Sequence, residues 1–138
     1  MLTAFIVDDN PGDRALIRRI LRASVSDPLQ IEEAWNLDDA LDRLRAGGID
    51  ILLLDLNLPG SRGVETVSRV RAVAPQVPII VVTGFEDQQI ASRVVGQGAQ
   101  GHLVKGTFDS RVLGLEISRC LARKPGESSS DVPPVPDA

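Results

Sequence analysis

Hydrophobic residues along the chain fall into five short runs, and between the runs they recur at intervals of three and four. The runs cover residues 2–7, 29–34, 48–55, 77–83 and 101–105. Short apolar runs predict β-strands, and the intervening spacing predicts helices. The first, third and fourth runs are almost continuously apolar, as in strands covered on both faces, whereas the second alternates and predicts an edge strand. Strands that alternate with helices predict an α/β domain with a parallel sheet.

The helical spacing also predicts which side chains of the helices face the core. They are Leu16, Ile17, Ile20 and Leu21, then Leu37, Ala40, Leu41 and Leu44, then Val64, Val67, Val70 and Ala74. Asn10 and Pro11 suit the N-cap and the first position of the first helix. Two further helices are expected over about 87–97 and about 109–122. Five helices would therefore accompany the five strands.

Composition bounds the number of domains. The chain has 138 residues, of which 43% are hydrophobic and 25% charged, so it can bury a sizeable core in one compact domain. We place this domain at residues 1–123. Residues 124–138 are rich in Pro and Ser with almost nothing to bury, and they predict a disordered tail.

The charge pattern narrows the class of partner. The net charge is −4 and no stretch is dense in Lys or Arg, which argues against a nucleic-acid ligand. No segment approaches the roughly 20 apolar residues of a membrane span, and no signal sequence precedes the first run. We therefore expect a protein or a small ion as partner, neither nucleic acid nor membrane, and a cytoplasmic location.

Polar residues end or directly follow four of the predicted strands. In a parallel α/β sheet the carboxyl ends of the strands form one edge, where ligands bind. Asp8, Asp9, Asp55, Thr83 and Lys105 should converge at that edge. Crowded carboxylates repel one another unless a hard cation neutralises them, and Mg²⁺ fits best. Lysine and a threonine hydroxyl opposite the metal would complete a cradle for a phosphoryl group, with Asp55 as the nucleophile.

Other conspicuous residues have structural interpretations. The pair Asp38-Asp39 begins a helical pattern, where carboxylates interact favourably with the helix dipole and remain solvated. Trp35 and Phe85 are interpreted as packing residues. Cys120 is the only cysteine, which excludes an internal disulfide, and it is interpreted as part of the core.

Four motifs, in this order and spacing, resemble the response-regulator receiver domain of two-component signalling. They are FIVDDN, LLLDLNLPGSRG, VVTG and HLVKG, within about residues 2–122. The resemblance implies a flavodoxin-like, doubly wound domain with a five-stranded parallel sheet in the order 2-1-3-4-5 and five flanking helices. Residues 1–123 would then form the receiver domain.

The resemblance also implies a role for each acidic residue. Asp55 would accept a phosphoryl group from a sensor histidine kinase or a histidine phosphotransfer protein. Asp9, Asp55 and the backbone carbonyl of Asn57 would bind Mg²⁺ directly, with Asp8 acting through water. Pro59 also fits the family's loop after the phosphorylated residue.

By the same resemblance, Lys105 would contact the phosphoryl oxygens and the Thr83 hydroxyl would turn toward them. His102 stands where the family usually has a Phe or Tyr switch residue, and its planar imidazole could turn in a similar way. Gly106 stands where many members have a cis proline, so no cis bond is expected there. Phosphorylation should then alter the face formed by the fourth helix, fifth strand and fifth helix, which is also the expected surface for any homodimer.

Two alternatives stay open. An unphosphorylated pseudo-receiver would bind partners without accepting a phosphoryl group. A Mg²⁺-dependent phosphohydrolase with an aspartyl nucleophile, like the haloacid dehalogenases, usually has a second aspartate two residues further on, where this chain has Asn57. We expect no enzymatic activity other than the domain's own phosphoryl transfer and autodephosphorylation. Since no output domain is recognised after residue 122, we expect the output to be a contact with a downstream protein target.

Overall fold

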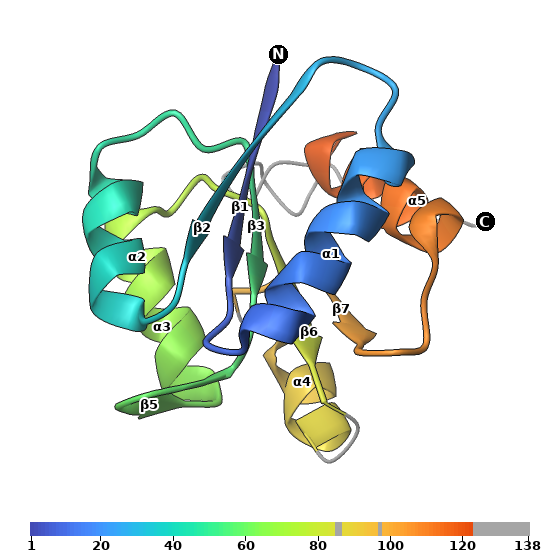
Figure 1. The fold of residues 1–138 in the computed structure, drawn as a ribbon. Helices are drawn as coiled ribbons and strands as arrows, with labels where there is room; N and C mark the ends of the chain where they lie inside the picture. Colours follow the sequence, from blue (N-terminus) through green and yellow to red (C-terminus); the bar gives the residue numbers. More distant parts are fainter. Residues whose placement is uncertain (85–86, 97, 123–138) are drawn as a thin grey trace, which may run out of the picture.

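The computed structural model describes residues 1–84, 87–96 and 98–122; Phe85 and the predicted tail 124–138 lie outside the described residues. One parallel sheet has the strand order β2-β1-β3-β6-β7 (Figure 1). Its strands are β1 (Leu2–Val7), β2 (Leu29–Ala34), β3 (Ile51–Leu54), β6 (Ile79–Thr83) and β7 (Gly101–Val104). Because β4 and β5 belong to a separate hairpin, this is the predicted order 2-1-3-4-5. The α/β flavodoxin-like fold is confirmed.

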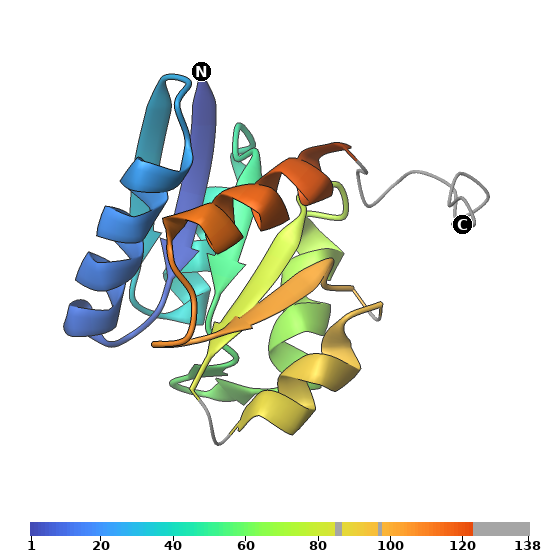
Figure 2. The same ribbon diagram turned by 90° about the vertical axis from the view of Figure 1, so that its right-hand side faces the viewer.

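Helices cover both faces of the sheet, as the term doubly wound requires. They are α1 (Pro11–Ser24), α2 (Leu37–Arg45), α3 (Val64–Val73), α4 (Gln88–Val94) and α5 (Ser110–Ala122). In Figure 1, α2 and α3 lie to the left of the sheet and α1 and α5 to the right. Figure 2 shows α1 and α5 side by side, and the backbone of Gly114 packs so closely on Ser24 that a Cβ would lie 2.9 Å from the Ser24 carbonyl oxygen. Glycine at this position permits the close approach.

Alternate residues of each central strand enter two separate cores. Phe5 and Val7 of β1 pack in the core beneath α2, α3 and α4, whereas Ala4 and Ile6 pack in the core beneath α1 and α5. Both sets are buried, which explains why β1, β3 and β6 are almost continuously apolar. The alternating strand β2 is at the edge, as predicted.

Two apolar residues assigned to the core stripes are exposed instead, and so is Trp35, which was interpreted as a packing residue. Leu16 is 41% exposed because it lies at the border of the α1 stripe, beside the buried Ile17. Val64 is 42% exposed at the first position of α3, at the end of the helix. Trp35 is 61% exposed because it follows edge strand β2, where the Arg14 guanidinium lies 5.1 Å from its ring centroid. Periodicity locates a stripe but not its borders.

A short hairpin after β3 was not predicted. It consists of β4 (Asn57–Leu58) and β5 (Ser61–Arg62), which pair antiparallel. The buried hydroxyl of Thr66 donates to the Leu56 carbonyl at 3.0 Å and lies 2.8 Å from the Ser61 hydroxyl. These bonds attach the segment that follows Asp55 to α3.

At the amino-terminal ends of β6 and β7, one guanidinium joins two loops. Arg71 donates from Nη1 to carbonyl oxygens of the loop before β6, those of Ala74, Pro75 and Val77, at 3.1, 2.9 and 2.9 Å. Its Nη2 donates to the Gly98 carbonyl in the turn before β7. Burial lowers the pKa of Arg71. The two strands are therefore fastened to each other at the end of the sheet opposite the predicted site.

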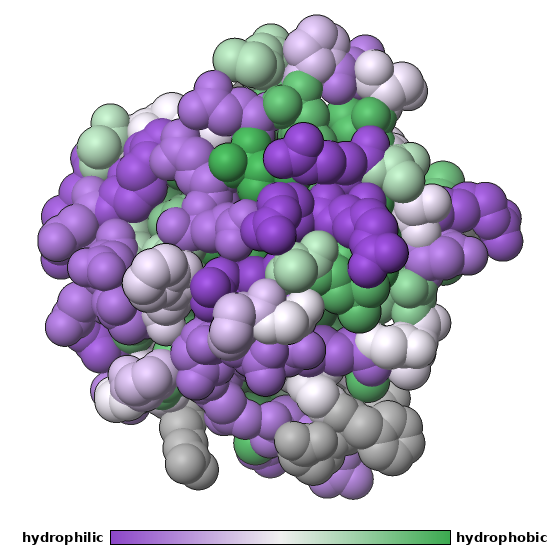
Figure 3. Space-filling model, in the orientation of Figure 1, coloured by the Kyte–Doolittle hydropathy of each residue, from purple (hydrophilic) through white to green (hydrophobic). Residues whose placement is uncertain are grey.

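The molecular surface agrees with the composition. Figure 3 shows that the face seen in Figure 1 is mostly hydrophilic, with hydrophobic side chains in scattered areas. Among the described residues, no helix has the length and apolar character to cross a membrane. Cys120 is buried, as expected.

Candidate functional site

The predicted site residues converge at the carboxyl ends of four strands. Asp8 follows β1, Asp55 follows β3, Thr83 ends β6 and Lys105 follows β7. Asp8, Asp55 and Thr83 are 1%, 6% and 0% exposed, whereas Asp9 reaches solvent. Because neighbouring parallel strands end at the same edge, residues 97 positions apart in the sequence, Asp8 and Lys105, become neighbours.

Three carboxylates at this edge could hold one cation. Asp8, Asp9 and Asp55 each offer one oxygen, and these oxygens all lie within 4.8 Å of one another. Such a set of anionic oxygen donors, two of them buried and one exposed, fits a hard divalent ion that keeps some of its water. The predicted metal residues are therefore brought together.

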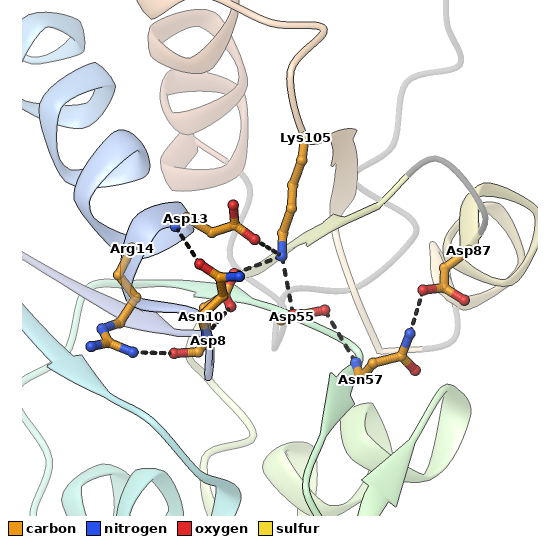
Figure 4. Close-up of polar contacts among 8 residues, drawn as sticks. All are labelled: Asp8, Asn10, Asp13, Arg14, Asp55, Asn57, Asp87 and Lys105. Atoms are coloured by element: carbon orange, nitrogen blue, oxygen red, sulfur yellow. Dashed lines mark hydrogen bonds and ion pairs between the residues drawn. The ribbon is translucent and has the colours of Figure 1, made fainter.

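Asn57 lies beside this set on β4. Its backbone N–H donates to Oδ1 of Asp55 at 3.1 Å, and its side-chain amide donates to Asp87 (Figure 4). These bonds fix the strand end around Asp55. The Asn57 carbonyl as a metal ligand stays a prediction.

The ammonium group of Lys105 has three carboxylate neighbours (Figure 4). Nζ donates to Oδ2 of Asp13 at 2.8 Å and to Oδ2 of Asp55 at 3.2 Å. Oδ2 of Asp8 lies 2.9 Å away, as an ion pair without the alignment of a hydrogen bond. Burial alone would lower the pKa of Lys105, but the hydrogen bond to Asp13 and the charges of the other two carboxylates raise it above its usual range. Lys105 is held as a cation.

Burial has the opposite consequence for Asp55. Loss of hydration raises its pKa from 3.8 to about 6, although the Asn57 N–H and the Lys105 charge act to lower it. The negative charge of Asp8 adds to the rise. A partly dehydrated carboxylate at neutral pH is a better nucleophile than a fully solvated one, and a bound cation would favour its charged form.

Thr83 and His102 were both predicted to take part in switching. The Thr83 hydroxyl oxygen is fully buried and has no hydrogen-bond partner among the residues that the structure describes. His102 is half-buried on β7, where it is in register with Val81 of β6, two residues before the strand end that carries Thr83. Thr83 therefore lies at the strand ends that form the site, whereas His102 lies on β7 two residues before the corresponding position.

The turn after Lys105 suits glycine. Gly106 has φ +82°, in the left-handed region that proline cannot adopt. Among the described residues there is no cis peptide bond, in agreement with the expectation for this position.

Sequence reasoning missed two residues of the site. Asp13 binds Lys105 from the first turn of α1, and Arg14 donates from Nη1 to the Asp8 carbonyl oxygen at 2.8 Å. The predicted cap contained the signal for Asp13: Asn10 accepts the Asp13 N–H at 3.0 Å, so a carboxylate three residues after the cap lies at the same edge as the strand ends. No local signal marks Arg14.

Comparison with known proteins gives the family. The sequence model of the family described as the response regulator receiver domain matches residues 4–117 of this chain. This chain belongs to the response regulator receiver family. The fold, the strand order and the convergence of the acidic residues with Lys105 all agree with membership.

Curated relatives are similar over most of this chain. It is 32% identical over 113 residues to the response regulator UvrY of Escherichia coli, a match that covers 82% of this chain and 51% of that protein. It is 30% identical over 113 residues to the glycerol metabolism activator of Pseudomonas putida, which covers 81% and 51%. The chain therefore spans about half the length of these relatives.

Solved structures show the same fold. A CheY-like receiver domain protein from Methanospirillum hungatei superposes with a TM-score of 0.74 at 22% identity, covering 88% of this chain and 94% of that one. The receiver domain of the sensor histidine kinase PA1611 from Pseudomonas aeruginosa superposes with a TM-score of 0.73 at 22% identity, covering 88% and 98%. That structure has a magnesium ion coordinated in its active site cleft.

Proposed function

We propose that this receiver domain accepts a phosphoryl group on Asp55 in a Mg²⁺-dependent reaction within a two-component phosphorelay. The observation that carries the proposal is the convergence of three carboxylates, Lys105 and the Thr83 hydroxyl at one edge of the sheet. The donor would be a sensor histidine kinase or a histidine phosphotransfer protein. The domain would catalyse only its own phosphoryl transfer and autodephosphorylation.

The residues at the edge have complementary parts in this reaction. A carboxylate oxygen of Asp55 would form a bond to phosphorus while the bond from phosphorus to the donor's imidazole nitrogen breaks, and that nitrogen keeps the electron pair. Lys105 would stabilise charge on the phosphoryl oxygens, and Thr83 would donate one hydrogen bond. Magnesium held by Asp8, Asp9 and Asp55, with the Asn57 carbonyl, would neutralise further negative charge.

The alternatives fit the site less well. A pseudo-receiver has no need for Asp55, Thr83 and Lys105 to meet at a buried edge. A phosphohydrolase needs a group near Asn57 that donates and recovers a proton, and this amide is instead hydrogen-bonded to Asp87.

Acetyl phosphate with Mg²⁺ tests the proposal directly. Intact mass should show one added phosphoryl group that is lost in base, and reduction with borohydride should map the acyl phosphate to residue 55. Asp55→Asn should abolish the modification, whereas Asp39→Asn, which removes an exposed carboxylate elsewhere, should leave it unchanged. Equal modification of Asp55→Asn would contradict the assignment, and an unmodified wild type would favour the pseudo-receiver.

The output would be a protein contact through the face of α4, β7 and α5. Phosphorylation adds about −1.5 to −2 of charge beside carboxylates, and Lys105 and Thr83 would move toward it. His102 on β7 could then turn inward and alter this face. Two apolar residues of α5, Val112 and Leu115, are exposed. A downstream protein or a second copy of the domain would bind there.

Amide spectra with and without beryllofluoride, a phosphoryl mimic, test this output model. Shifts should extend from the Asp55 loop through β7 to α4 and α5, and they should persist when residues 126–138 are removed. Shifts confined to the Asp55 loop, or a response that is lost with the tail, would contradict it.

A further inference from the structure

The first turn of α1 contributes a carboxylate to Lys105 that no motif of the site includes. We propose that Asp13 is a positioning residue: it holds the Lys105 ammonium in the unphosphorylated protein and releases it when Asp55 carries a phosphoryl group. This inference rests on the proposed phosphorylation of Asp55. The contact between Asp13 of α1 and Lys105 would then depend on whether Asp55 is phosphorylated.

Competition for the Lys105 ammonium explains why phosphorylation would weaken one of its contacts. An ammonium group has three N–H donors, and here three carboxylates surround it at 2.8, 2.9 and 3.2 Å. A phosphoryl group on Asp55 brings new acceptor oxygens to the same ammonium. The phosphoryl oxygens would therefore compete with the three carboxylates for Lys105, which hydrogen-bonds to Asp13 and Asp55 and pairs with Asp8 by charge alone.

Burial decides which carboxylate is released. The side chain of Asp13 is 37% exposed, whereas those of Asp8 and Asp55 are 2% and 8% exposed. A carboxylate that can be hydrated loses an ion pair at small cost, but the buried carboxylate of Asp8 would be left as an uncompensated charge. Asp55 would itself carry the phosphoryl group that Lys105 binds. Asp13 is therefore the partner that leaves.

The release needs only a side-chain rotation. The backbone N–H of Asp13 donates to Oδ1 of Asn10, the N-cap of α1, and this bond does not involve the Asp13 carboxylate. The freed carboxylate would stay in the first turn of the helix, where the helix dipole favours negative charge. Asp13 can thus exchange Lys105 for water while α1 keeps its position.

A matched control exists in α2. Asp39 also lies three residues after an asparagine N-cap, and its N–H donates to Oδ1 of Asn36 at 2.8 Å. Asp39 has no contact with Lys105 among the described residues, and it reaches solvent. Asp13→Asn and Asp39→Asn therefore remove the same charge from the same helical position.

The test uses the ammonium signal of Lys105 itself. The chain contains only two lysines, Lys105 and Lys124, so a ¹⁵N-lysine sample of Lys124→Arg has a single side-chain ammonium resonance. In this background, Asp13→Asn should shift the Lys105 resonance and speed its exchange with water, whereas Asp39→Asn should not.

Binding of beryllofluoride with Mg²⁺ tests the release. Without its competitor, Lys105 should bind the mimic more readily, so Asp13→Asn should tighten the affinity about twofold to fivefold, the range of one partly exposed ion pair. Asp13→Glu keeps a carboxylate within reach and should restore the wild-type affinity. A merely structural Asp13 would give weaker binding or none of these changes.

The outcomes separate the two proposals. If the wild type binds beryllofluoride and Asp13→Asn changes neither the affinity nor the Lys105 resonance, the role of Asp13 is wrong while the phosphoacceptor stands. If the wild type neither binds beryllofluoride nor accepts a phosphoryl group, the proposed function fails and the release step with it. The resting contact is still decided by the Lys105 resonance, because that measurement needs no phosphoryl mimic.

Discussion

The helices α1 and α2 begin in the same way and serve different purposes. Each has an asparagine N-cap, Asn10 or Asn36, whose side chain accepts the N–H of an aspartate three residues later. Asp13 of α1 binds Lys105, whereas among the described residues Asp39 of α2 hydrogen-bonds only to its own cap. The difference comes from the preceding strand: β1 is central and ends beside β3, whereas β2 is at the sheet edge.

The two Asp-Asp pairs of the chain teach the same lesson. The side chain of Asp8 is 2% exposed and lies at the site, whereas that of Asp38 is 91% exposed and is 3.8 Å from Arg69. An exposed pair of this kind contributes little to stability. Identical Asp-Asp dipeptides thus have different roles that depend on the strand before them: one lies at the candidate metal site and the other is a solvated helix end.

The two Asp-Asp pairs should differ most in their contribution to Mg²⁺ binding. Asp9→Ala removes one of the three carboxylates that lie within 4.8 Å of one another, and it should weaken Mg²⁺ binding by more than about 100-fold, beyond the loss typical of supporting residues. Asp39→Ala should bind Mg²⁺ as the wild type does. Titration calorimetry measures both, and equal affinities for the two variants would refute the metal assignment.

The buried charge of Asp55 should produce the next largest difference, in stability without metal. Its pKa in the folded protein is about 6, above the ordinary 3.8, so the folded state binds more protons than the unfolded state between these values. The free energy of unfolding should therefore fall as pH rises from about 4 to about 6. With EDTA at pH 8, Asp55→Asn should be more stable than the wild type by about 2 kcal/mol, and the gap should largely close near pH 4.

Urea unfolding at the two pH values measures this effect. Asp39→Asn serves as the control, and its exposed charge should change the free energy of unfolding by less than about 1 kcal/mol at either pH. Added Mg²⁺ should stabilise the wild type but not Asp55→Asn. A wild type that gains stability as pH rises through this window would contradict the dehydration of Asp55.

The caps themselves should give the smallest difference. Asn10→Ala and Asn36→Ala should each cost about 1 kcal/mol of stability, because each removes the acceptor for one N–H of a first turn. Only Asn10→Ala should also shift the Lys105 ammonium resonance, since it loosens the turn that carries Asp13. Urea unfolding and the lysine spectrum together would show whether the two helix starts are equivalent in stability and distinct in function.

Most of the fold could be predicted because strands buried on both faces leave a strong signal. The runs that became β1, β3 and β6 are almost continuously apolar, and their strand order followed from the family resemblance. The hairpin of β4 and β5 was missed because each strand has only two residues, too few for any periodicity. Its stability comes from Thr66 and Ser61, which no local pattern connects.

The site could be predicted as far as it lies at strand ends. Asp8, Asp55, Thr83 and Lys105 directly follow or end apolar runs, so topology alone brings them together. Asp13 lies on a helix, and its contact with Lys105 depends on how α1 is placed against the sheet. Helix placement is a tertiary property that spacing along the chain does not record.

Arg71 limits how the domain can change shape. Its guanidinium binds the Val77 carbonyl before β6 and the Gly98 carbonyl before β7, and it therefore links the two strands at that end. A displacement of β7 would then be smaller near Gly101, beside this link, than at Lys105. The proposed phosphorylation of Asp55 would then rotate β7 about this end, and α4 and α5 would respond to a change in the angle of the strand.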